Sequence, residues 1–222
     1  MIRAVLFDRD DTISVANPGM YLEASQWAAA QFGVKQKTVL DVMRQHWQHE
    51  FGSWWALRSL DDERAFWRRY GESLAFDLGL SAAQGEALMT QFPYHAFMQP
   101  APGVRELLEA LRARGLKIGV LSNTLPDIWP TLKAIGVDDL VDVALSSCLL
   151  GVHKPELEVF KLAANKLDLP TEQVLFFDDK PENVTAARSA GMSAELVDLT
   201  GETVGALGSL PEVLAWVEAQ LT

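Results

Sequence analysis

The stretch Ile2-Arg3-Ala4-Val5-Leu6-Phe7-Asp8-Arg9-Asp10-Asp11-Thr12 decides the fold of this chain. Its first half is rich in Val, Leu and Phe, which predicts a fully buried parallel strand. The carboxyl ends of such strands line the crevice where open α/β sheets bind ligands. Three acids within four residues repel one another unless a cation neutralises them. We therefore interpret the cluster as a functional site for a hard divalent ion, the alternative being a solvated turn.

Length and composition limit the class of protein. The chain has 222 residues with 49% apolar content, which is enough for one α/β domain and a sizeable insertion. A net charge of −11 argues against binding to nucleic acid or to an anionic membrane. A single cysteine, Cys148, excludes an internal disulfide and fits a reducing compartment. With no signal peptide and no apolar stretch of about 18 residues, we expect a cytoplasmic protein without nucleic-acid or membrane partners.

Strand-like and helix-like stretches alternate from about residue 102 to the end of the chain. Apolar runs typical of buried strands cover residues 116–121, 142–145, 173–177 and 194–197, and amphipathic stretches of helical length separate them. One of these helices is expected to begin at Pro126, which suits a first turn. This order predicts an α/β fold with a doubly wound parallel sheet.

Residues 15–99 interrupt the alternation. They show helical periodicity and no convincing strand, and Pro- and Gly-containing segments at 17–19 and 99–103 mark the two ends. We predict a core domain of residues 1–14 and 100–222 with an inserted α-helical cap domain of residues 15–99. Five of the seven tryptophans lie in this insertion, where we interpret them mainly as packing residues.

Polar residues terminate the later strands as well. Ser122 and Asn123 follow the second strand, Lys154 precedes a helix, and Asp178 and Asp179 follow the run that ends at Phe177. If the strands are parallel neighbours, all these side chains converge on one crevice with the first acidic cluster.

The set and its order resemble the haloacid dehalogenase-like (HAD) hydrolase superfamily over nearly the whole chain. Residues 8–12 match the first motif of that family, Asp-x-Asp-x-Thr, Ser122 matches the second, Lys154-Pro155 the third and Asp178-Asp179 the fourth. The insertion between the first and second motifs is similar to the helical cap of one subclass. The resemblance implies a Rossmann-like core and the phosphatase branch of the family.

For the chemistry, the resemblance implies Mg²⁺-dependent hydrolysis of a small phosphorylated metabolite through an aspartyl-phosphate. Asp8 is the expected nucleophile, and Asp10 is the expected acid and base for the leaving oxygen and the water. Lys154 is expected to neutralise charge on Asp8 and on the phosphoryl group. Mg²⁺ is expected to bind Asp8, the backbone carbonyl of Asp10 and Asp179.

The resemblance also assigns supporting residues. Ser122, Asn123 and Arg9 are expected to bind the phosphate, although Asn123 fits a helix cap equally well. Behind them, we expect three residues to support the site: Asp178, Asn183 and Thr12. An exchange of the roles of Asp178 and Asp179 at the metal stays open.

Two points in the first motif concern Asp10 and Asp11. To act as an acid, Asp10 must hold a proton when substrate is bound, so the surrounding carboxylates and the bound phosphate are expected to raise its pKa above the usual value of about 3.9. Asp11 stands where the family commonly has Gly, which tolerates backbone angles that Asp reaches only at a cost. We therefore expect altered loop geometry and extra negative charge at this position.

Other functions share parts of this pattern. A phosphomutase of the same superfamily has the same core motifs, but residues 21–27 lack the basic and His residues of a mutase cap helix. A non-catalytic binding protein of this fold would normally have lost part of the intact motif set. Asp10 disfavours a dehalogenase, because that branch lacks a second carboxylate there. The sequence leaves the substrate unidentified and a homodimer open.

Overall fold

A five-stranded parallel sheet forms the centre of the computed structural model, which describes residues 1–221. Its strands are β1 (Ala4–Phe7), β4 (Lys117–Ser122), β5 (Val143–Ser146), β6 (Val174–Asp178) and β7 (Ser193–Leu196), in the order β5-β4-β1-β6-β7. Every neighbouring pair is parallel. The predicted doubly wound α/β fold is thus confirmed, with β1 in the middle of the sheet.

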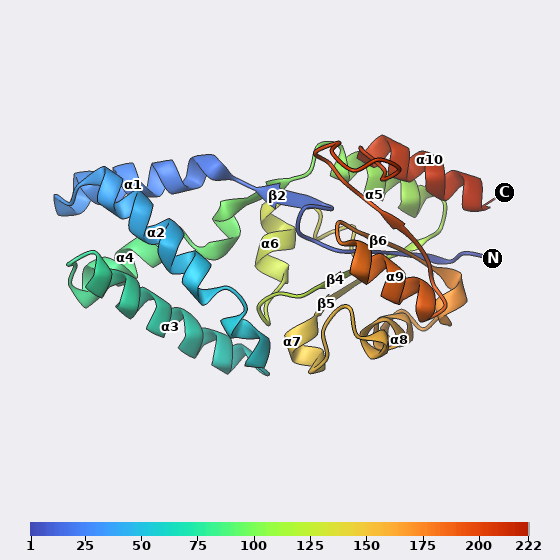
Figure 1. Cartoon of the computed structure of the whole chain (residues 1–222), viewed down its shortest axis with the longest axis horizontal. Helices are drawn as coiled ribbons and strands as arrows, with labels where there is room; N and C mark the ends of the chain where they lie inside the picture. Colours follow the sequence, from blue (N-terminus) through green and yellow to red (C-terminus); the bar gives the residue numbers. More distant parts are fainter. Residues whose placement is uncertain (222) are drawn as a thin grey trace.

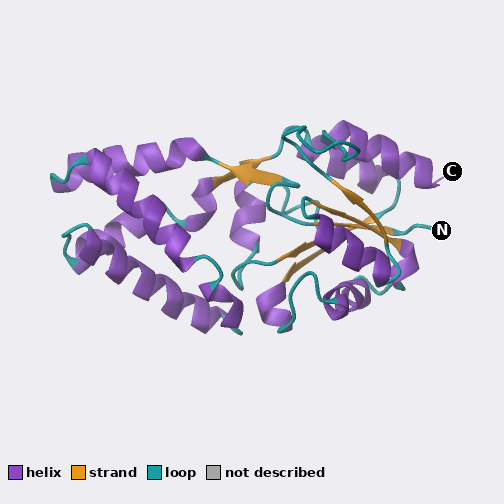
Figure 2. Ribbon diagram, in the orientation of Figure 1, coloured by secondary structure: helices purple, strands orange, loops and turns teal. Residues whose placement is uncertain are grey.

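Helices cover both faces of this sheet (Figures 1 and 2). Val5 and Phe7 pack into one layer with α5 (Val104–Ala113), α6 (Trp129–Ala134) and α10 (Leu210–Leu221). Ala4 and Leu6 point to the other face, because successive strand side chains alternate, and pack with α8 (Leu157–Lys166) and α9 (Pro181–Ser189). β1 is therefore buried on both sides, as its continuous apolar run predicts.

The register of the strands brings the ends of three of them together. Phe7 of β1 lies beside Val120 of β4 and Phe177 of β6. Asp8 and Asp178 consequently emerge at one edge of the sheet, close to the end of β4 at Ser122. The same edge receives the short helix α7 (Ser147–Leu150) and the loop that leads to α8.

A group of helices between β1 and β4 lies to one side of the sheet (Figure 1). This helical insertion contains α1 (Pro18–Phe32), α2 (Gln36–Glu50), η1 (Ser53–Ala56), α3 (Leu60–Asp77), α4 (Ala82–Gln91) and η2 (Tyr94–Phe97). Side chains of Asn17, Ser59 and Ser81 cap α1, α3 and α4. The insertion has a hydrophobic cluster that includes the deeply buried Phe66 and Leu74 and extends to Leu125, which follows β4.

Two sequence-based expectations were wrong. The connections of the insertion form a short antiparallel pair, β2 (Ser14–Ala16) with β3 (Met98–Pro100), where no strand was expected. Each strand has only three residues, too few for an alternating pattern to show. The helix expected at Pro126 begins at Trp129, and Pro130 occupies its first turn. Pro126 lies in the loop before it.

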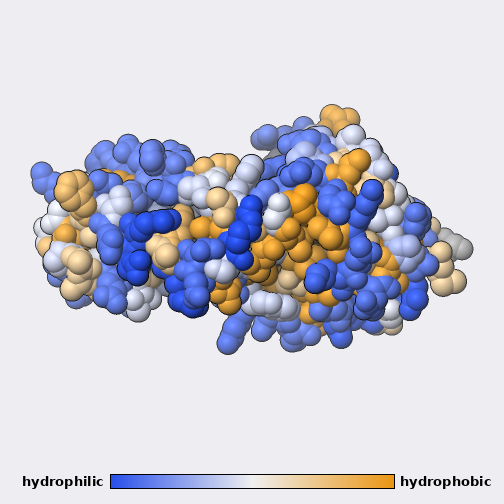
Figure 3. Space-filling model, turned by 90° about the horizontal axis from the view of Figure 1, so that it is seen from below, coloured by the Kyte–Doolittle hydropathy of each residue, from blue (hydrophilic) through white to orange (hydrophobic). Residues whose placement is uncertain are grey.

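The surface shows where apolar residues gather. Seen from below, the core half carries a broad hydrophobic area, while the insertion is mostly hydrophilic (Figure 3). Leu149 of α7 and Leu157 of α8 are both strongly exposed. Within residues 1–221, no helix combines the length and the hydropathy that crossing a membrane requires.

Candidate active site

Lys154 joins the ends of β1 and β6. Its Nζ atom lies 2.5 Å from Oδ1 of Asp8 and 2.6 Å from Oδ2 of Asp178. All three residues are buried, with Lys154 5% and Asp8 6% exposed. Burial of charges is costly unless they are paired, and here one ammonium bridges two carboxylates. The structure thus brings together residues that lie 146 positions apart in the sequence.

Asp178 has no oxygen free of protein hydrogen bonds. Besides Lys154, it accepts hydrogen bonds at Oδ1 from the backbone N–H of Lys180 and from Nδ2 of Asn183, both at 2.9 Å. Asn183 lies in the first turn of α9, which places its amide directly behind the carboxylate. Asp178 is therefore held rigidly, whereas the neighbouring Asp179 is only half-buried, and its carboxylate has no comparable set of donors among residues 1–221.

Three of these acids could hold a metal ion together. One carboxylate oxygen from each of Asp8, Asp178 and Asp179 lies within 4.8 Å of the others. An all-oxygen donor set suits hard divalent cations such as Mg²⁺. Because both oxygens of Asp178 already accept hydrogen bonds, Asp179 and Asp8 have more lone pairs left for a cation.

The pKa values of the acids follow their surroundings. Burial raises the pKa of Asp8 to about 7, an effect that Lys154 opposes and that Asp178 and Asp10 reinforce. Burial and the charge of Asp178 raise the pKa of Asp179 to about 6. Burial is the largest cause of both shifts, and neighbouring carboxylates add to it. A bound divalent cation would favour the ionised carboxylates and so act against both shifts.

Asp10 has different partners. Its two carboxylate oxygens accept hydrogen bonds from Nε and Nη2 of Arg9 at 2.9 and 2.8 Å. Burial acts to raise the pKa of Asp10, but the charge and hydrogen bonds of Arg9 outweigh it, so the pKa is lowered. In the protein without phosphate, the adjacent guanidinium therefore outweighs burial at Asp10. The raised pKa expected from the sequence applies to the substrate-bound state and stays a prediction.

The structure also places the remaining predicted residues. A polar pocket of about 50 Å³ is lined by Asp8, Asp10, Asp11, Ser122, Asn123, Lys154, Asp179, Lys180 and Asn183. Asn123 does not cap a helix there: its amide donates to the carbonyl of Lys154 and accepts from the N–H of Lys154. The hydroxyl of Thr12 is buried and lacks a hydrogen-bond partner among the described residues.

Arg9 does not line this pocket. The side chain is 1% exposed and points instead toward Tyr94 and Thr124, as well as Asp10. The side chain of Arg9 therefore does not reach the pocket in which it was expected from the sequence to bind phosphate.

Asp11 adopts the left-handed backbone region, with φ of 55°. This is the conformation that favours glycine, so Asp11 adopts the kind of backbone angle that was expected from the sequence to be costly for Asp. The Asp11 side chain is exposed, and its carboxylate lies near Lys180 at the rim of the pocket.

The family model for haloacid dehalogenase-like hydrolases matches residues 2–191. The chain belongs to this family. A curated relative from Mycobacterium tuberculosis (strain CDC 1551 / Oshkosh), named phosphatase MT3486, is 35% identical over 207 residues, covering 91% of this chain and 90% of the relative.

Solved structures share the fold of this HAD-like hydrolase. The crystal structure of the L-2-haloacid dehalogenase PA0810 has a TM-score of 0.73 and 21% identity over 99% of this chain and 100% of the other. A HAD family enzyme from Bacteroides thetaiotaomicron, solved with magnesium and inorganic phosphate, has a TM-score of 0.60 and 18% identity over 92% and 98% of the two chains.

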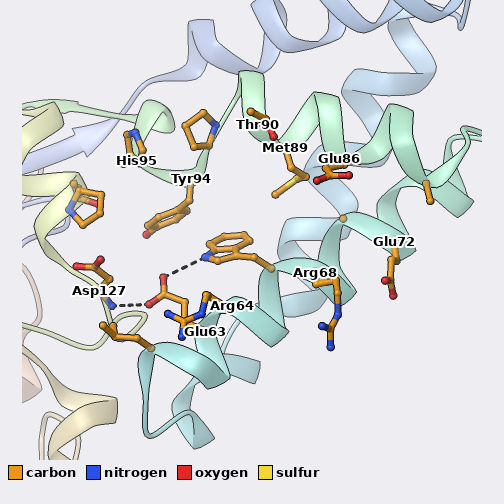
Figure 4. Close-up of a pocket in the computed structure, with 17 residues that line it drawn as sticks. Glu63, Arg64, Arg68, Glu72, Glu86, Met89, Thr90, Tyr94, His95 and Asp127 are labelled. Atoms are coloured by element: carbon orange, nitrogen blue, oxygen red, sulfur yellow. Dashed lines mark hydrogen bonds between the residues drawn. The ribbon is translucent and has the colours of Figure 1, made fainter.

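A larger cavity lies between the helical insertion and the core of the hydrolase. It has a volume of about 660 Å³ and lies among α3, α4, the segment from Pro93 to His95 and the start of α6 (Figure 4). Trp67 and Tyr94 are among the residues that line it. Glu63 bridges the two sides, since it accepts hydrogen bonds from the backbone N–H of Asp127 at 2.6 Å and from Nε1 of Trp67 at 3.2 Å.

Sequence reasoning missed the residues that join the insertion to the core. The sequence alone predicts no function for Glu63, Tyr94 or Thr124. Trp55 of η1 also stacks on His153, beside Lys154, with ring centroids 5.2 Å apart. None of these pairs has a local sequence signal, because the partners lie far apart in the chain.

Proposed function

We propose that this HAD-like hydrolase is a Mg²⁺-dependent phosphatase that hydrolyses a small phosphorylated metabolite through an aspartyl-phosphate on Asp8. The observation that carries the proposal is the convergence of Asp8, Lys154 and Asp179 on one small polar pocket. The phosphatase name of the Mycobacterium tuberculosis relative supports the same reaction. The presence of Asp10 two residues after the nucleophile favours phosphate chemistry over dehalogenation.

Asp8, Asp179 and the backbone carbonyl of Asp10 would hold the Mg²⁺, and Asp178 would support them. The carboxylate oxygens of Asp8, Asp178 and Asp179 lie within 4.8 Å of one another, which suits a hard divalent ion, and the magnesium in the Bacteroides thetaiotaomicron fold neighbour supports this choice. The ion supplies positive charge against the phosphoryl oxygens and the Asp8 carboxylate.

In the first step, an oxygen of Asp8 attacks phosphorus and the bond from phosphorus to the ester oxygen breaks. For Asp10 to give a proton to the departing oxygen, the charge of the bound phosphate must raise the pKa of Asp10 against the lowering effect of Arg9. Lys154 compensates the charge of the phosphoryl group. In the second step, Asp10 takes a proton from water, which attacks phosphorus and releases inorganic phosphate and free Asp8. Ser122 would bind a phosphoryl oxygen, while Asn123 fixes the Lys154 loop.

The helical insertion would act as a cap over this pocket. We place its boundaries at residues 15–99, with residues 1–14 and 100–222 as the core domain. The cavity and the bridging Glu63 at the junction are consistent with an insertion that excludes water and contacts the leaving group.

The test is phosphate release from a panel of sugar, nucleotide and organic-acid phosphates, with and without Mg²⁺. We expect Mg²⁺-dependent release that Asp8→Asn abolishes and that the surface control Asp138→Asn leaves unchanged. Isomerised phosphate esters in place of free phosphate would indicate a mutase. No turnover of any ester, with ligand binding retained, would indicate a binding protein and overturn the proposal.

A further inference from the structure

Arg9 and Asp10, which are adjacent in the sequence, form an ion pair with two hydrogen bonds between the guanidinium and the carboxylate. Arg9 is among the largest fully buried side chains of the described chain, and its guanidinium grips both oxygens of Asp10. Two parallel N–H to oxygen bonds fix a carboxylate in one plane, which a single point charge cannot do. The carboxylate of Asp10 is therefore held in one orientation by its neighbour in the sequence.

Arg9 in turn is held from two other elements. Its Nη2 atom donates to the hydroxyl of Tyr94 in η2 and to Oγ1 of Thr124 in the loop after β4, both at 2.9 Å. The guanidinium carbon also lies 5.7 Å from the centre of the Tyr94 ring. One guanidinium thus connects the first motif, the second motif loop and the helical insertion.

Tyr94 is anchored firmly in the insertion. Its ring packs on Trp47 and Trp67 with centroid distances of 5.2 and 5.6 Å, inside the aromatic cluster that joins α2 and α3. Any movement of the insertion relative to the sheet therefore carries the Tyr94 hydroxyl with it. The hydrogen bond to Arg9 transmits that movement to the group that orients Asp10.

We propose that Arg9 is a positioning residue, which sets the orientation of the Asp10 carboxylate and couples it, through Tyr94, to the placement of the helical insertion. The inference rests on the proposed function, because Asp10 matters as an acid only if the reaction is ester hydrolysis. It replaces direct phosphate binding as the role of Arg9.

If Arg9 positions Asp10, its loss should slow the hydrolysis of one class of ester more than another, whereas a purely structural role predicts no such difference. Protonation of the leaving group is needed for an alkyl phosphate, whose alkoxide leaves poorly, and hardly at all for 4-nitrophenyl phosphate, whose phenolate leaves without a proton. Misplacing Asp10 should therefore slow the first ester selectively. General damage to the fold or to phosphate binding should slow both esters equally.

The experiment compares kcat/KM for glycerol phosphate or another alkyl phosphate that the wild type hydrolyses with kcat/KM for 4-nitrophenyl phosphate. For Tyr94→Phe we expect a loss of about tenfold with the alkyl ester and less than about twofold with the aryl ester. Arg9→Lys, which keeps the charge but loses the bidentate geometry, should give a larger loss of the same kind. Tyr70→Phe is the matched control, because Tyr70 packs on the same Trp67 but is not bonded to Arg9, and both rates should stay unchanged.

Failure of the proposed phosphatase activity and failure of the positioning role of Arg9 would give different results. A wild type that releases phosphate from no ester of the panel, so that no alkyl substrate can be chosen, contradicts the proposed function itself. A wild type that hydrolyses both the alkyl and the aryl ester, with Tyr94→Phe slowing them equally or leaving both unchanged, overturns only the positioning role. If Arg9→Lys fails to fold, the Tyr94→Phe comparison decides alone, since that variant removes a single hydroxyl at a half-buried position.

Discussion

The ammonium of Lys154 and the carboxylate of Asp8 are 2.5 Å apart in a place almost closed to solvent. Lys154 also neutralises Asp178, so it is the only cation in direct contact with either carboxylate among the described residues. Opposite charges raise the pKa of Lys154 even though burial acts to lower it, which keeps the ammonium charged. The pair therefore combines a role in stability with the expected role in catalysis.

Replacing the cation should damage both properties. In Lys154→Met, two carboxylates lose their buried partner, and removing one member of a buried pair typically costs about 3–5 kcal/mol. We expect a stability loss of that size in denaturant unfolding without metal, and a fall in kcat/KM of at least about 10²-fold. The control Lys166→Met, at an exposed position of α8, should change neither. A stable Lys154→Met protein in the absence of metal would contradict this account.

Mg²⁺ should stabilise the protein more at pH 8 than at pH 5. The pKa values of Asp8, about 7, and Asp179, about 6, lie above the usual 3.8. At pH values between 3.8 and about 7, the native state binds more protons than the unfolded state. The free energy of unfolding without metal therefore falls as the pH rises through this range. Metal binding requires the ionised carboxylates, and its gain therefore grows as they lose their protons.

Thermal unfolding with and without Mg²⁺ measures this effect. At a concentration 100 times the dissociation constant, the gain at pH 8 should be about 2.7 kcal/mol. At pH 5 and the same Mg²⁺ concentration, the gain in stability should be much smaller, because the protonated carboxylates bind the ion less tightly. Asp179→Asn should remove most of the gain, whereas Asp138→Asn, at an exposed position away from the site, should retain it. An equal gain at both pH values would show that these acids do not hold the ion.

The parts that the sequence could predict are those with a local signal. The run from Ala4 to Phe7 is buried on both faces, so every one of its residues had to be apolar. The polar residues after β1, β4 and β6 stand at strand ends, and parallel strands bring such ends to one edge. The apolar runs therefore predict the parallel sheet, and the polar residues at the strand ends predict that Asp8, Ser122 and Asp178 lie close together.

Contacts between distant segments could not be predicted in the same way. Arg9 meets Tyr94 across 85 positions, and Glu63 meets Asp127 across 64. Neither pair leaves a pattern in its own neighbourhood, because the geometry depends on how the insertion is placed on the core. The effect of Arg9 on the pKa of Asp10 also depends on the direction in which the Arg9 side chain turns, and the sequence of the two adjacent residues does not fix that direction.

The backbone at Asp11 permits a test of the loop in the first motif. With φ of 55°, residue 11 occupies a region that costs most residues roughly 1 kcal/mol, Asp and Asn less, and Gly nothing in steric terms. We expect Asp11→Gly and Asp11→Asn to stay within about 1 kcal/mol of the wild type, and Asp11→Ala to lose about 1 kcal/mol. Asp168, with φ of 58° in a loop after α8, is the matched position outside the site. The same order of stabilities at both positions is expected in denaturant unfolding; an Asp11→Ala protein as stable as Asp11→Gly would exclude the backbone explanation.

The close approach of α3 and α4 allows the packing of the insertion to be tested separately from the site. A Cβ atom added at Gly85 would lie 2.6 Å from Cβ of Ala75 and 3.0 Å from the carbonyl oxygen of Gly71. Helix propensity alone favours Gly→Ala by about 1 kcal/mol, but overpacking against backbone typically costs about 1–3 kcal/mol. We therefore expect Gly85→Ala to lower stability in chemical denaturation, even though alanine is the better helix former.

Gly71 is the control position. The nearest atom there is Cγ of Met89 at 3.2 Å, and a flexible side chain can move away. Gly71→Ala should accordingly be neutral or stabilising, and a stabilised Gly85→Ala protein would show that the two helices have room to separate.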